Sequence, residues 1–324
     1  MPAAAAGTAL AGPMTAASLN VVLRRGILAT ADSAWVQRLV RRHGMRLGAA
    51  RFVGGETLDD VVPVLRGLNA KGLRANTTLL GEDVCDEAAA RAVVGRYEEI
   101  LERLQRERLD ANVALKLTHL GLTTDEELAY ENVARLVERA GELGNFVRID
   151  MEDSTCVDPT LRIYRRLREA GHANVGTVLQ SYLYRSEDDL QSILPLAPNL
   201  RIVKGAYLEP PEVAYPRKAD VDSAYARMVE AALPAAGFTA IATHDRTLLD
   251  RAAAFAEREG VGRERFEFQM LYGVRPRLQL ELVDRGFAVR VATPYGPDWY
   301  PYLMRRLAER PANVLFFLRS LFLR

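Results

Sequence analysis

From about residue 74 onward, short apolar runs alternate with longer amphipathic stretches. A short apolar run bounded by turn residues predicts a buried strand, and strands that alternate with helices indicate βαβ units and a parallel sheet. The strand candidates in this rhythm are residues 73–80, 113–117, 146–151, 175–179, 200–203, 239–242, 266–270 and 288–291.

The stretches between these runs predict helices. Segments such as "DEAAARAVVGRYEEILERL" and "TDEELAYENVARLVERAGEL" carry acidic residues at their starts, and glycine follows several of them, as capping and the helix dipole favour. Eight strands that alternate with helices favour a (β/α)8 barrel over an open doubly wound sheet. The chain also lacks the G-x-G-x-x-G turn expected after the first strand of an open nucleotide-binding sheet. We therefore expect an α/β barrel.

The two ends of the chain do not follow this alternation of strand and helix patterns. We expect residues 1–45 to form an N-terminal helical extension and residues 46–324 to form the barrel domain together with a C-terminal helix. The first basic residue is Arg24, so a secretory signal is not indicated, and no apolar stretch reaches the roughly 18 residues of a membrane span. The apolar end "NVLFFLRSLFLR" predicts a helix that packs on the barrel or, alternatively, touches a membrane surface.

Charge and cysteine content exclude several classes of protein. The 43 basic and 42 acidic residues nearly cancel, so nothing suggests a surface that follows nucleic acid. Cys85 and Cys156 lie far apart, and the four histidines are scattered, which does not match the ligand spacing of a zinc site. We expect a reduced, cytoplasmic protein without a metal.

The predicted strands end in polar residues, at the edge where a (β/α)8 barrel builds its active site. These residues are Lys116, Asp150, Glu152, Asp153, Gln180, Arg201, Lys204, Thr243, His244, Asp245 and Gln269. A single one has a structural explanation, since a lysine can reach the barrel rim and His244 could be a satisfied core histidine. Buried charges cost several kcal/mol each unless they are paired. Their convergence therefore predicts a bound polar ligand.

The charged members of this group are mostly cations, and the last predicted helix adds more. In "YPYLMRRLAER", Tyr302, Arg305, Arg306 and Glu309 follow the i, i+3, i+4, i+7 spacing of one helix face. Taken alone, such a face is more often solvated than functional. Guanidinium groups suit a carboxylate or a phosphate, and Gly205 in "VKGAY" allows close approach to a phosphate. The residues thus indicate an enzyme for a small anion, with a phosphate-bearing cofactor as an option.

The stretches "RIDMEDST", "LQSYLYRSEDDL", "LRIVKGAYLEP", "ATHD", "FEFQMLYGV", "VRVATPYG" and "YLMRRLAE" occur in this order. In this order they resemble proline dehydrogenase, in particular the monofunctional bacterial enzymes, over roughly residues 45 to 320. The resemblance implies a distorted (β/α)8 barrel that holds FAD non-covalently. It also implies oxidation of L-proline to Δ1-pyrroline-5-carboxylate, with electrons passed from the flavin to a quinone.

The resemblance also assigns roles to individual residues. The residues that would hold FAD are Met151, Gln180, Arg201, Lys204, Gly205, Ala206, Thr243 and His244, with Glu309 tying the last helix to the site. Arg201 would lie near the flavin N5 atom, and Asp150 would order this cationic site. The residues that would grip the proline carboxylate are Lys116, Arg305 and Arg306, while Leu271 and Tyr302 would pack on the substrate ring.

One position departs from the family pattern. Ala292 in "VRVATPYG" stands where the family usually has a tyrosine that lines the pocket. A tyrosine lost from a packed pocket leaves room for extra substituents. We therefore expect weaker proline binding and better tolerance of 4-hydroxyproline or larger cyclic amines, unless Tyr295 or Trp299 fills the space.

Two other interpretations remain open from the sequence. Lys116 or Lys204 could be the nucleophile of a Schiff-base aldolase, which would bind no flavin. The barrel could also be a non-enzymatic binding module, which would leave the charges at the strand ends without chemistry. For the dehydrogenase, the resemblance implies functional coupling to a pyrroline-5-carboxylate dehydrogenase on a separate chain and a possible peripheral membrane contact.

Overall fold

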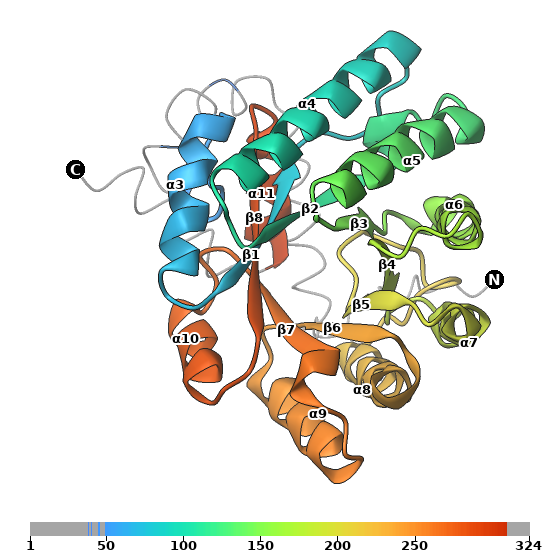
Figure 1. Ribbon diagram of the computed structural model, residues 1–324. Coiled ribbons are helices and arrows are strands. Elements are labelled where there is room, and N and C mark those ends of the chain that lie inside the picture. Colours follow the sequence, from blue (N-terminus) through green and yellow to red (C-terminus); the bar gives the residue numbers. More distant parts are fainter. Residues whose placement is uncertain (1–37, 39, 41–44, 46–48, 310–324) are drawn as a thin grey trace, which may run out of the picture.

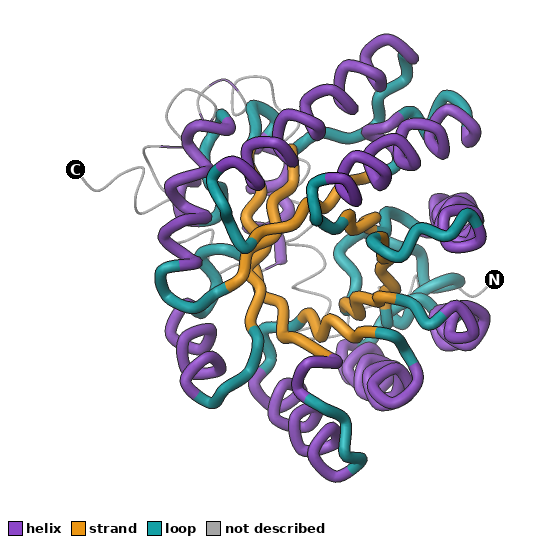
Figure 2. Tube along the Cα trace, viewed as in Figure 1, coloured by secondary structure: helices purple, strands orange, loops and turns teal. Residues whose placement is uncertain are grey.

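The computed structural model describes residues 38, 40, 45 and 49–309, and within this part of the chain eight parallel strands close into a barrel. Each strand pairs with the next one in chain order, and β8 pairs with β1 (Figures 1 and 2). The strands are β1 (Arg74–Leu79), β2 (Ala111–Lys116), β3 (Val147–Asp150), β4 (Val175–Gln180), β5 (Asn199–Val203), β6 (Phe238–Ala242), β7 (Phe266–Leu271) and β8 (Val289–Tyr295). The (β/α)8 prediction is confirmed.

Helices surround the barrel and connect its strands (Figure 2). They are α3 (Leu58–Asn69), α4 (Glu87–Arg106), α5 (Glu126–Glu142), α6 (Val157–Glu169), α7 (Ser186–Ile193), α8 (Lys218–Ala235), α9 (Arg246–Arg258) and α10 (Pro276–Asp284). A further helix, α11 (Trp299–Glu309), follows β8. Within residues 49–309, no helix is long and apolar enough to cross a membrane.

The acidic residues predicted at the helix starts cap these helices. Asp86, Asp125 and Asp245 accept hydrogen bonds from backbone amides in the first turns of α4, α5 and α9. Thr57 and Asp60 form a reciprocal capping box at the start of α3. These bonds satisfy amide groups that have no partner within the helix. Each cap therefore stabilises the first turn of its helix and marks the residue at which the helix begins.

The two faces of the barrel strands differ sharply in polarity. The outward residues are mainly apolar and pack under the helices, as Phe268, Ile202 and Ile149 do. The inward residues include many polar ones. Some of them bond to each other across the interior, where a side chain of β5 reaches side chains of β3 and β7. These inward polar residues are Asn76, Asn112, Lys116, Arg148, Asp150, Gln180, Arg201, Glu267, Gln269 and Arg290. The interior is therefore a polar core that opens at the C-terminal ends of the strands, which we call the mouth.

Each predicted strand overlaps an observed strand, and only the ends differ. The largest difference is in β8, which runs to Tyr295, beyond the predicted end at residue 291. The carbonyl groups of Pro294 and Tyr295 accept hydrogen bonds from Gly54 and Leu80, which hold this extra length in place. The added residues include Pro294, and proline is uncommon inside strands.

A second apolar cluster lies outside the main core and joins α11 to the start of the chain. Trp299, Leu303 and Met304 of α11 pack there with Val40 and Phe52. The expected extension at residues 1–45 and the apolar end at residues 313–324 lie almost wholly outside the described residues. The proposed division at residue 45 therefore stays a prediction.

Candidate active site at the barrel mouth

A carboxylate bridges two of the predicted substrate-binding cations. Lys116, the last residue of β2, pairs with one oxygen of Glu82 in the loop after β1. Arg305 Nη1, from α11, donates to the other oxygen of Glu82 at 2.7 Å. Burial alone raises the pKa of Glu82, but the charges of Lys116 and Arg305 outweigh it and lower the pKa from its ordinary value. The mouth thus holds a carboxylate between two cations that come from different parts of the chain.

The local backbone explains why Glu82 turns toward the mouth. Gly81 has a φ of +159°, and a Cβ atom there would lie 2.3 Å from Nε2 of His119. Glycine lets the loop pass close to this ring. His119 is buried beside the charged mouth, and its burial, together with repulsion by Lys116, lowers its pKa to about 4. It is therefore a neutral packing partner of the loop at physiological pH.

Arg201 occupies the centre of the mouth, held from two sides. Its Nη1 donates to Asp150 Oδ1 at 2.5 Å, and its Nε donates to Gln269 Oε1 at 2.6 Å. The Nη2 atom is buried and has no hydrogen-bond partner among the described residues. A buried donor without a partner is costly. Arg201 therefore offers one buried N–H group to a ligand.

Two further predicted cofactor residues lie at neighbouring strand ends. Gln180, at the end of β4, is buried, and its Oε1 has no hydrogen-bond partner within residues 49–309. Met151 is buried directly after β3. Glu152 accepts hydrogen bonds from the amide and hydroxyl groups of Thr118, which ties the loops after β2 and β3 together. The pair Gln180 and Arg201 thus presents an unused acceptor and an unused donor, which fits a polar, ring-shaped cofactor.

The turn after β5 is built around a glycine. Gly205 has a φ of +115°, and a Cβ atom there would lie 2.3 Å from the ring of Tyr182. Its neighbour Lys204 donates to Asp222 at 2.5 Å and lies 3.5 Å from Asp245. The glycine therefore allows the backbone to pass over a tyrosine, and Lys204 is anchored by two carboxylates at the rim.

His244 connects two strand ends rather than standing alone. Its Nε2 accepts a hydrogen bond from the backbone amide of Leu271 at 2.9 Å. Thr243 is buried, and its hydroxyl accepts a hydrogen bond from the amide of Asp245. The contact between His244 and Leu271 links a residue predicted to hold the cofactor with a residue predicted to touch the substrate ring.

The helical face predicted at the end of the chain lies partly against the mouth. Arg305 reaches Glu82, as described above, and the guanidinium of Arg306 lies 5.3 Å from the centre of the Tyr302 ring. Tyr302 is half-buried against the second apolar cluster. The side chain of Glu309 lies outside the described part of the chain, so its predicted role stays a prediction. The Arg305 side chain is 25% exposed and paired with Glu82, so it is not fully solvated, and the ligand-binding role of this helix face stays a prediction.

Ala292 faces the barrel interior, next to Leu271 of β7 in strand register. Tyr295 lies three residues further along β8, so in a regular strand it points to the opposite face. Trp299 is buried in the second apolar cluster, and its Nε1 donates to Glu56 at 2.6 Å. Both aromatic residues proposed as replacements for the family tyrosine therefore have other packing partners.

Sequence reasoning missed two residues of the mouth. Glu82 was one of several acidic residues in "GEDVCDE", and no pattern distinguished it from its neighbours. Tyr207 is half-buried over the mouth, where burial and the nearby charges of Glu152 and Glu82 raise its pKa. It stands two residues after the glycine of "VKGAY", so its place in that segment was an available signal.

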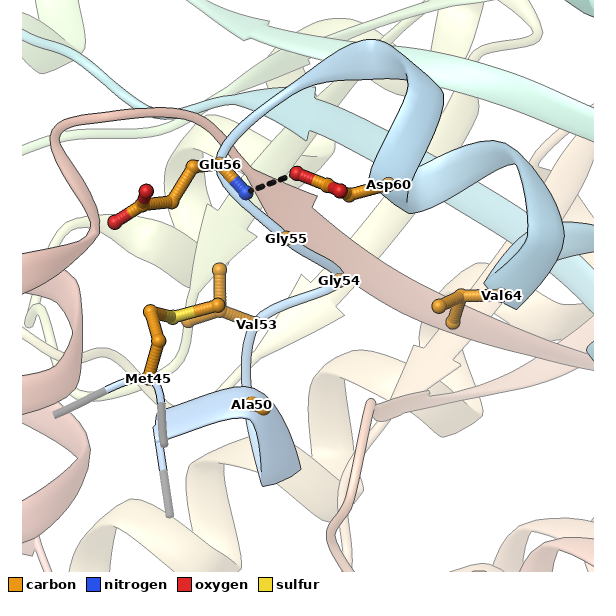
Figure 3. Close-up of a pocket in the computed structure, with 8 residues that line it drawn as sticks. All are labelled: Met45, Ala50, Val53, Gly54, Gly55, Glu56, Asp60 and Val64. Atoms are coloured by element: carbon orange, nitrogen blue, oxygen red, sulfur yellow. Dashed lines mark hydrogen bonds between the residues drawn. The ribbon is translucent and has the colours of Figure 1, made fainter. Parts of the chain in front are cut away.

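A cavity of about 360 Å³ lies beside the start of α3, and its lining residues Gly54 and Gly55 are hydrogen-bonded to the chain at the end of β8 (Figure 3). Its lining residues are Met45, Ala50, Val53, Gly54, Gly55, Glu56, Asp60 and Val64. Figure 3 shows the backbone amide of Glu56 donating to Asp60, so these polar groups belong to the helix cap. None of the predicted site residues lines this cavity.

The fold and the mouth together define an α/β-barrel enzyme for a small anionic substrate, with an arginine that presents a buried donor at the centre of the site. Comparison with protein-family models matches residues 61–319 to the family described as "Proline dehydrogenase". The chain belongs to the proline dehydrogenase family.

Two relatives show how far this similarity extends. "Proline dehydrogenase" of Deinococcus radiodurans is 41% identical over 307 residues, which cover 94% of this chain and 99% of the relative. "Proline dehydrogenase 2" of Bacillus subtilis subsp. natto is 40% identical over 301 residues, which cover 93% of this chain and 99% of the relative. The similarity therefore covers almost the whole length of both relatives.

The barrel also resembles part of longer solved structures. Proline utilization A (PutA) from Bdellovibrio bacteriovorus, inactivated by N-propargylglycine, superposes with a TM-score of 0.79 at 24% identity. The superposition covers 94% of this chain and 38% of that one. This chain therefore spans little more than a third of the PutA protein, and the similarity concerns the fold.

Proposed function

We propose that this protein oxidises L-proline to Δ1-pyrroline-5-carboxylate. The observation that carries the proposal is the carboxylate of Glu82 bridging Lys116 and Arg305. The same two cations are suited to the carboxylate of proline, since charge-assisted bonds from lysine and arginine are among the strongest that proteins make. We infer that the substrate carboxylate takes hydrogen bonds from these cations, and that Arg306 adds a third contact.

We further propose FAD, bound without a covalent link, as the oxidant. The unused Oε1 of Gln180 and Nη2 of Arg201 support a polar ring system at the centre of the mouth. Bound flavin supplies the two-electron acceptor that the amino acid side chains themselves lack. The residues that would hold it are Met151, Gln180, Arg201, Lys204, Gly205, Ala206, Thr243 and His244.

The residues of the mouth account for binding and for the state of the substrate amine. Oxidation removes a hydride from the ring carbon next to nitrogen and a proton from the nitrogen, and a carbon–nitrogen double bond forms between them. Lys116 and Arg305 disfavour an ammonium nearby, so they help the amine to lose its proton. Arg201, held by Asp150, provides positive charge where negative charge develops during reduction.

The aldolase alternative is weaker than the dehydrogenase. Lys116 is paired with Glu82, and Lys204 is paired with Asp222. Schiff-base chemistry needs a lysine amine that is free to attack a carbonyl group, and both of these amines are engaged in ion pairs. Neither lysine has the apolar surroundings that release an amine for Schiff-base chemistry.

Ala292 supports a broader substrate range as the second candidate function. It faces the interior beside Leu271, and neither Tyr295 nor Trp299 replaces the missing ring. We propose that 4-hydroxyproline is accepted better here than in relatives with a tyrosine at this place. Ala292→Tyr should then raise the preference for proline, because the added ring fills the space that a hydroxyl group would need.

The test is anaerobic reduction of the purified protein by proline and by 4-hydroxyproline, followed by absorbance. The protein should be yellow, with a flavin band near 450 nm that bleaches with either substrate. Protein that binds no flavin would overturn the dehydrogenase proposal. Bleaching by proline alone, with a preference of several hundredfold, would overturn only the broader substrate range.

Two partners remain proposals that rest on the family. We propose a quinone as the electron acceptor and a separate pyrroline-5-carboxylate dehydrogenase as the enzyme that consumes the product. Reoxidation of the reduced protein by a soluble quinone, compared with oxygen, tests the first. The effect of the second enzyme on the accumulation of pyrroline-5-carboxylate tests the coupling.

A further inference from the structure

A continuous chain of hydrogen bonds runs through the barrel interior from deep in the core to the mouth. Arg290 Nε and Gln269 Nε2 each donate to Glu267 Oε1 at 2.7 Å. Arg201 Nε donates to Gln269 Oε1 at 2.6 Å, and its Nη1 donates to Asp150. We call these five residues the interior chain. Arg201 and Asp150 belong to the predicted site, whereas the other three have no assigned role.

The deep part of the interior chain is almost wholly buried. Glu267 is 2% exposed, Gln269 5% and Arg290 9%. Burial alone raises the pKa of Glu267, but the charge of Arg290 and the hydrogen bonds from Arg290 and Gln269 outweigh it and lower the pKa. The carboxyl group is therefore ionised at neutral pH. An ionised carboxylate can only accept hydrogen bonds.

Gln269 connects a group that only donates hydrogen bonds with a group that only accepts them. The guanidinium of Arg201 is a donor without acceptor capacity, and the carboxylate of Glu267 is an acceptor without donor capacity. An amide has one end of each kind. Only one orientation of the Gln269 amide satisfies both neighbours, with its oxygen toward Arg201 and its nitrogen toward Glu267. Glu267 therefore selects that orientation.

The orientation of Gln269 then determines that of Arg201. The guanidinium group is planar, and bonds at Nε and Nη1 fix both its place and its plane. Its buried Nη2 is left without a hydrogen-bond partner among the described residues. If Gln269 turned its nitrogen toward Arg201, two donors would face each other and this anchor would be lost.

We infer that Glu267 and Gln269 are positioning residues for the proposed oxidation, acting on the cofactor site through Arg201. The inference rests on the proposed function, because that proposal places Arg201 at the reacting part of the flavin. Loss of this positioning should affect the chemical step more than substrate binding, since the proposed carboxylate-binding cations, Lys116 and Arg305, are bonded to Glu82 rather than to the interior chain. The alternative is that Glu267 and Gln269 only stabilise the barrel.

The first variant to test is Gln269→Met, which keeps the length of the side chain and removes both hydrogen bonds. We expect the rate of flavin reduction by saturating proline to fall roughly tenfold to a hundredfold, as small misplacements of reacting groups do. The KM should change much less. We also expect a more negative midpoint potential of the bound flavin, where a tenfold change in a two-electron equilibrium corresponds to about 30 mV.

A charge-swap pair tests the hydrogen-bond logic directly. Gln269→Glu alone places two carboxylates against each other with no donor between them. The double variant Glu267→Gln/Gln269→Glu again pairs one amide with one carboxylate, with the two groups exchanged. The amide at position 267 accepts from Arg290 and donates to the carboxylate at position 269, which in turn accepts from Arg201. We expect the double variant, which keeps the total charge of the interior, to recover most of the reduction rate that Gln269→Glu loses.

The matched control is Asn199→Ala. Asn199 is the partner of Arg148 in the same barrel interior, and within residues 49–309 no hydrogen bond links it to Arg201. This variant should lower the melting temperature, because it removes a hydrogen bond to a buried guanidinium. It should leave the reduction rate per bound flavin within about twofold of wild type and the midpoint potential unchanged.

Two results would overturn the positioning role. One is a Gln269→Met protein that loses stability but keeps the wild-type reduction rate and potential. The other is a double variant that is no better than Gln269→Glu. Failure of the proposed function would look different, because the wild-type protein itself would then show no flavin reduction with proline.

Discussion

Arginine–carboxylate pairs occur in two contrasting settings in this barrel, around its outside and through its inside. On the outside, each junction between consecutive helices from α3 to α10 carries at least one such pair, which we call the outer belt. The pairs are Arg103–Asp59, Arg135–Glu98, Arg139–Glu102, Arg162–Glu126, Arg166–Glu127, Arg185–Asp158, Arg227–Glu187, Arg251–Glu230, Arg246–Glu281 and Arg285–Asp250. The interior chain uses the same chemistry with its deep members, Arg290 and Glu267, almost wholly removed from water.

Solvent exposure separates the two settings. The Arg135 side chain in the outer belt is 64% exposed, whereas Glu267 in the interior chain is 3% exposed at its side chain. An exposed pair contributes about 0 to 1 kcal/mol, because water and salt solvate each partner almost as well. A buried pair that loses one partner costs about 3 to 5 kcal/mol, because a charge is left in the core. Ion pairs with similar donor–acceptor distances therefore contribute very differently to stability in the two settings.

The largest effect should come from Arg290→Met. This change removes the closest cation that Glu267 faces and leaves a buried carboxylate whose remaining cation, the half-exposed Arg74, lies 3.5 Å from its second oxygen. We expect a loss of about 3 kcal/mol in the free energy of unfolding at pH 8. Urea unfolding measures it. Arg135→Met is the control from the outer belt and should cost less than about 1 kcal/mol. Equal losses of unfolding free energy in Arg290→Met and Arg135→Met would contradict the distinction between buried and exposed pairs.

The Arg290→Met effect should also depend on pH. In the wild-type protein the pKa of Glu267 is lowered, so its contribution to stability is present above the unfolded pKa and is lost as pH falls through the folded one. Without Arg290, the largest influence that offsets burial is gone, so the pKa of Glu267 rises, although the hydrogen bond from Gln269 and the charge of Arg74 still lower it. As the pH falls, a larger fraction of this carboxyl group is then protonated, which removes the buried charge. We expect a smaller loss of stability at pH 5 than at pH 8, and a pH-independent loss would contradict this assignment.

The next largest effect should come from Arg305→Ala at the mouth. If Arg305 binds the substrate carboxylate as proposed, the variant loses a charge-assisted bond worth about 1.5 to 3 kcal/mol, so the KM for proline should rise on the order of tenfold to a hundredfold. Arg306→Ala should act in the same direction. Circular dichroism checks that the fold is intact, and Arg135→Ala should leave the KM unchanged. An unchanged KM for both Arg305→Ala and Arg306→Ala would show that this helix face does not bind the substrate.

The sequence was sufficient for the architecture because the outward strand faces and the helix faces carry a regular apolar pattern. Runs such as "FVRID" and "FEFQM" identified strands through residues like Ile149 and Phe268. The polar residues at the strand ends also located the mouth, because all eight strands are parallel. These predictions depend only on local pattern and on the direction of the strands.

The contacts inside the barrel could not be predicted in the same way. Arg201 and Gln269 lie 68 residues apart, and Arg201 and Asp150 lie 51 apart, on strands that are not neighbours. Whether such side chains meet depends on the stagger of the strands, which follows from packing around the whole barrel. Glu82 was missed for a related reason, since the pattern of a loop does not say which carboxylate turns inward.

A smaller effect should follow from weakening several outer-belt pairs together. The combined variant Glu98→Gln, Glu102→Gln, Glu126→Gln and Glu127→Gln removes, for four arginines, the carboxylate partner on the neighbouring helix among α4, α5 and α6. At about 0.3 to 0.5 kcal/mol for each pair, the sum is roughly 1 to 2 kcal/mol and a few degrees in melting temperature. The reduction rate and the KM for proline should not change. A loss above that of Arg290→Met would mean that the outer belt acts as one cooperative network.

The smallest effect should be the coupling within one exposed pair, and it distinguishes the two settings most directly. A double-mutant cycle with Arg135→Ala, Glu98→Ala and the double variant should give a coupling of about 0.5 kcal/mol, although the guanidinium makes two hydrogen bonds at 2.7 and 2.9 Å. At 1 M salt the screening length is about 3 Å, so the coupling should nearly vanish. The same cycle for Arg290 and Glu267 should keep its coupling at high salt, because ions do not enter the core. A salt-independent coupling at the exposed pair would show that geometry, rather than burial, determines the strength of these pairs.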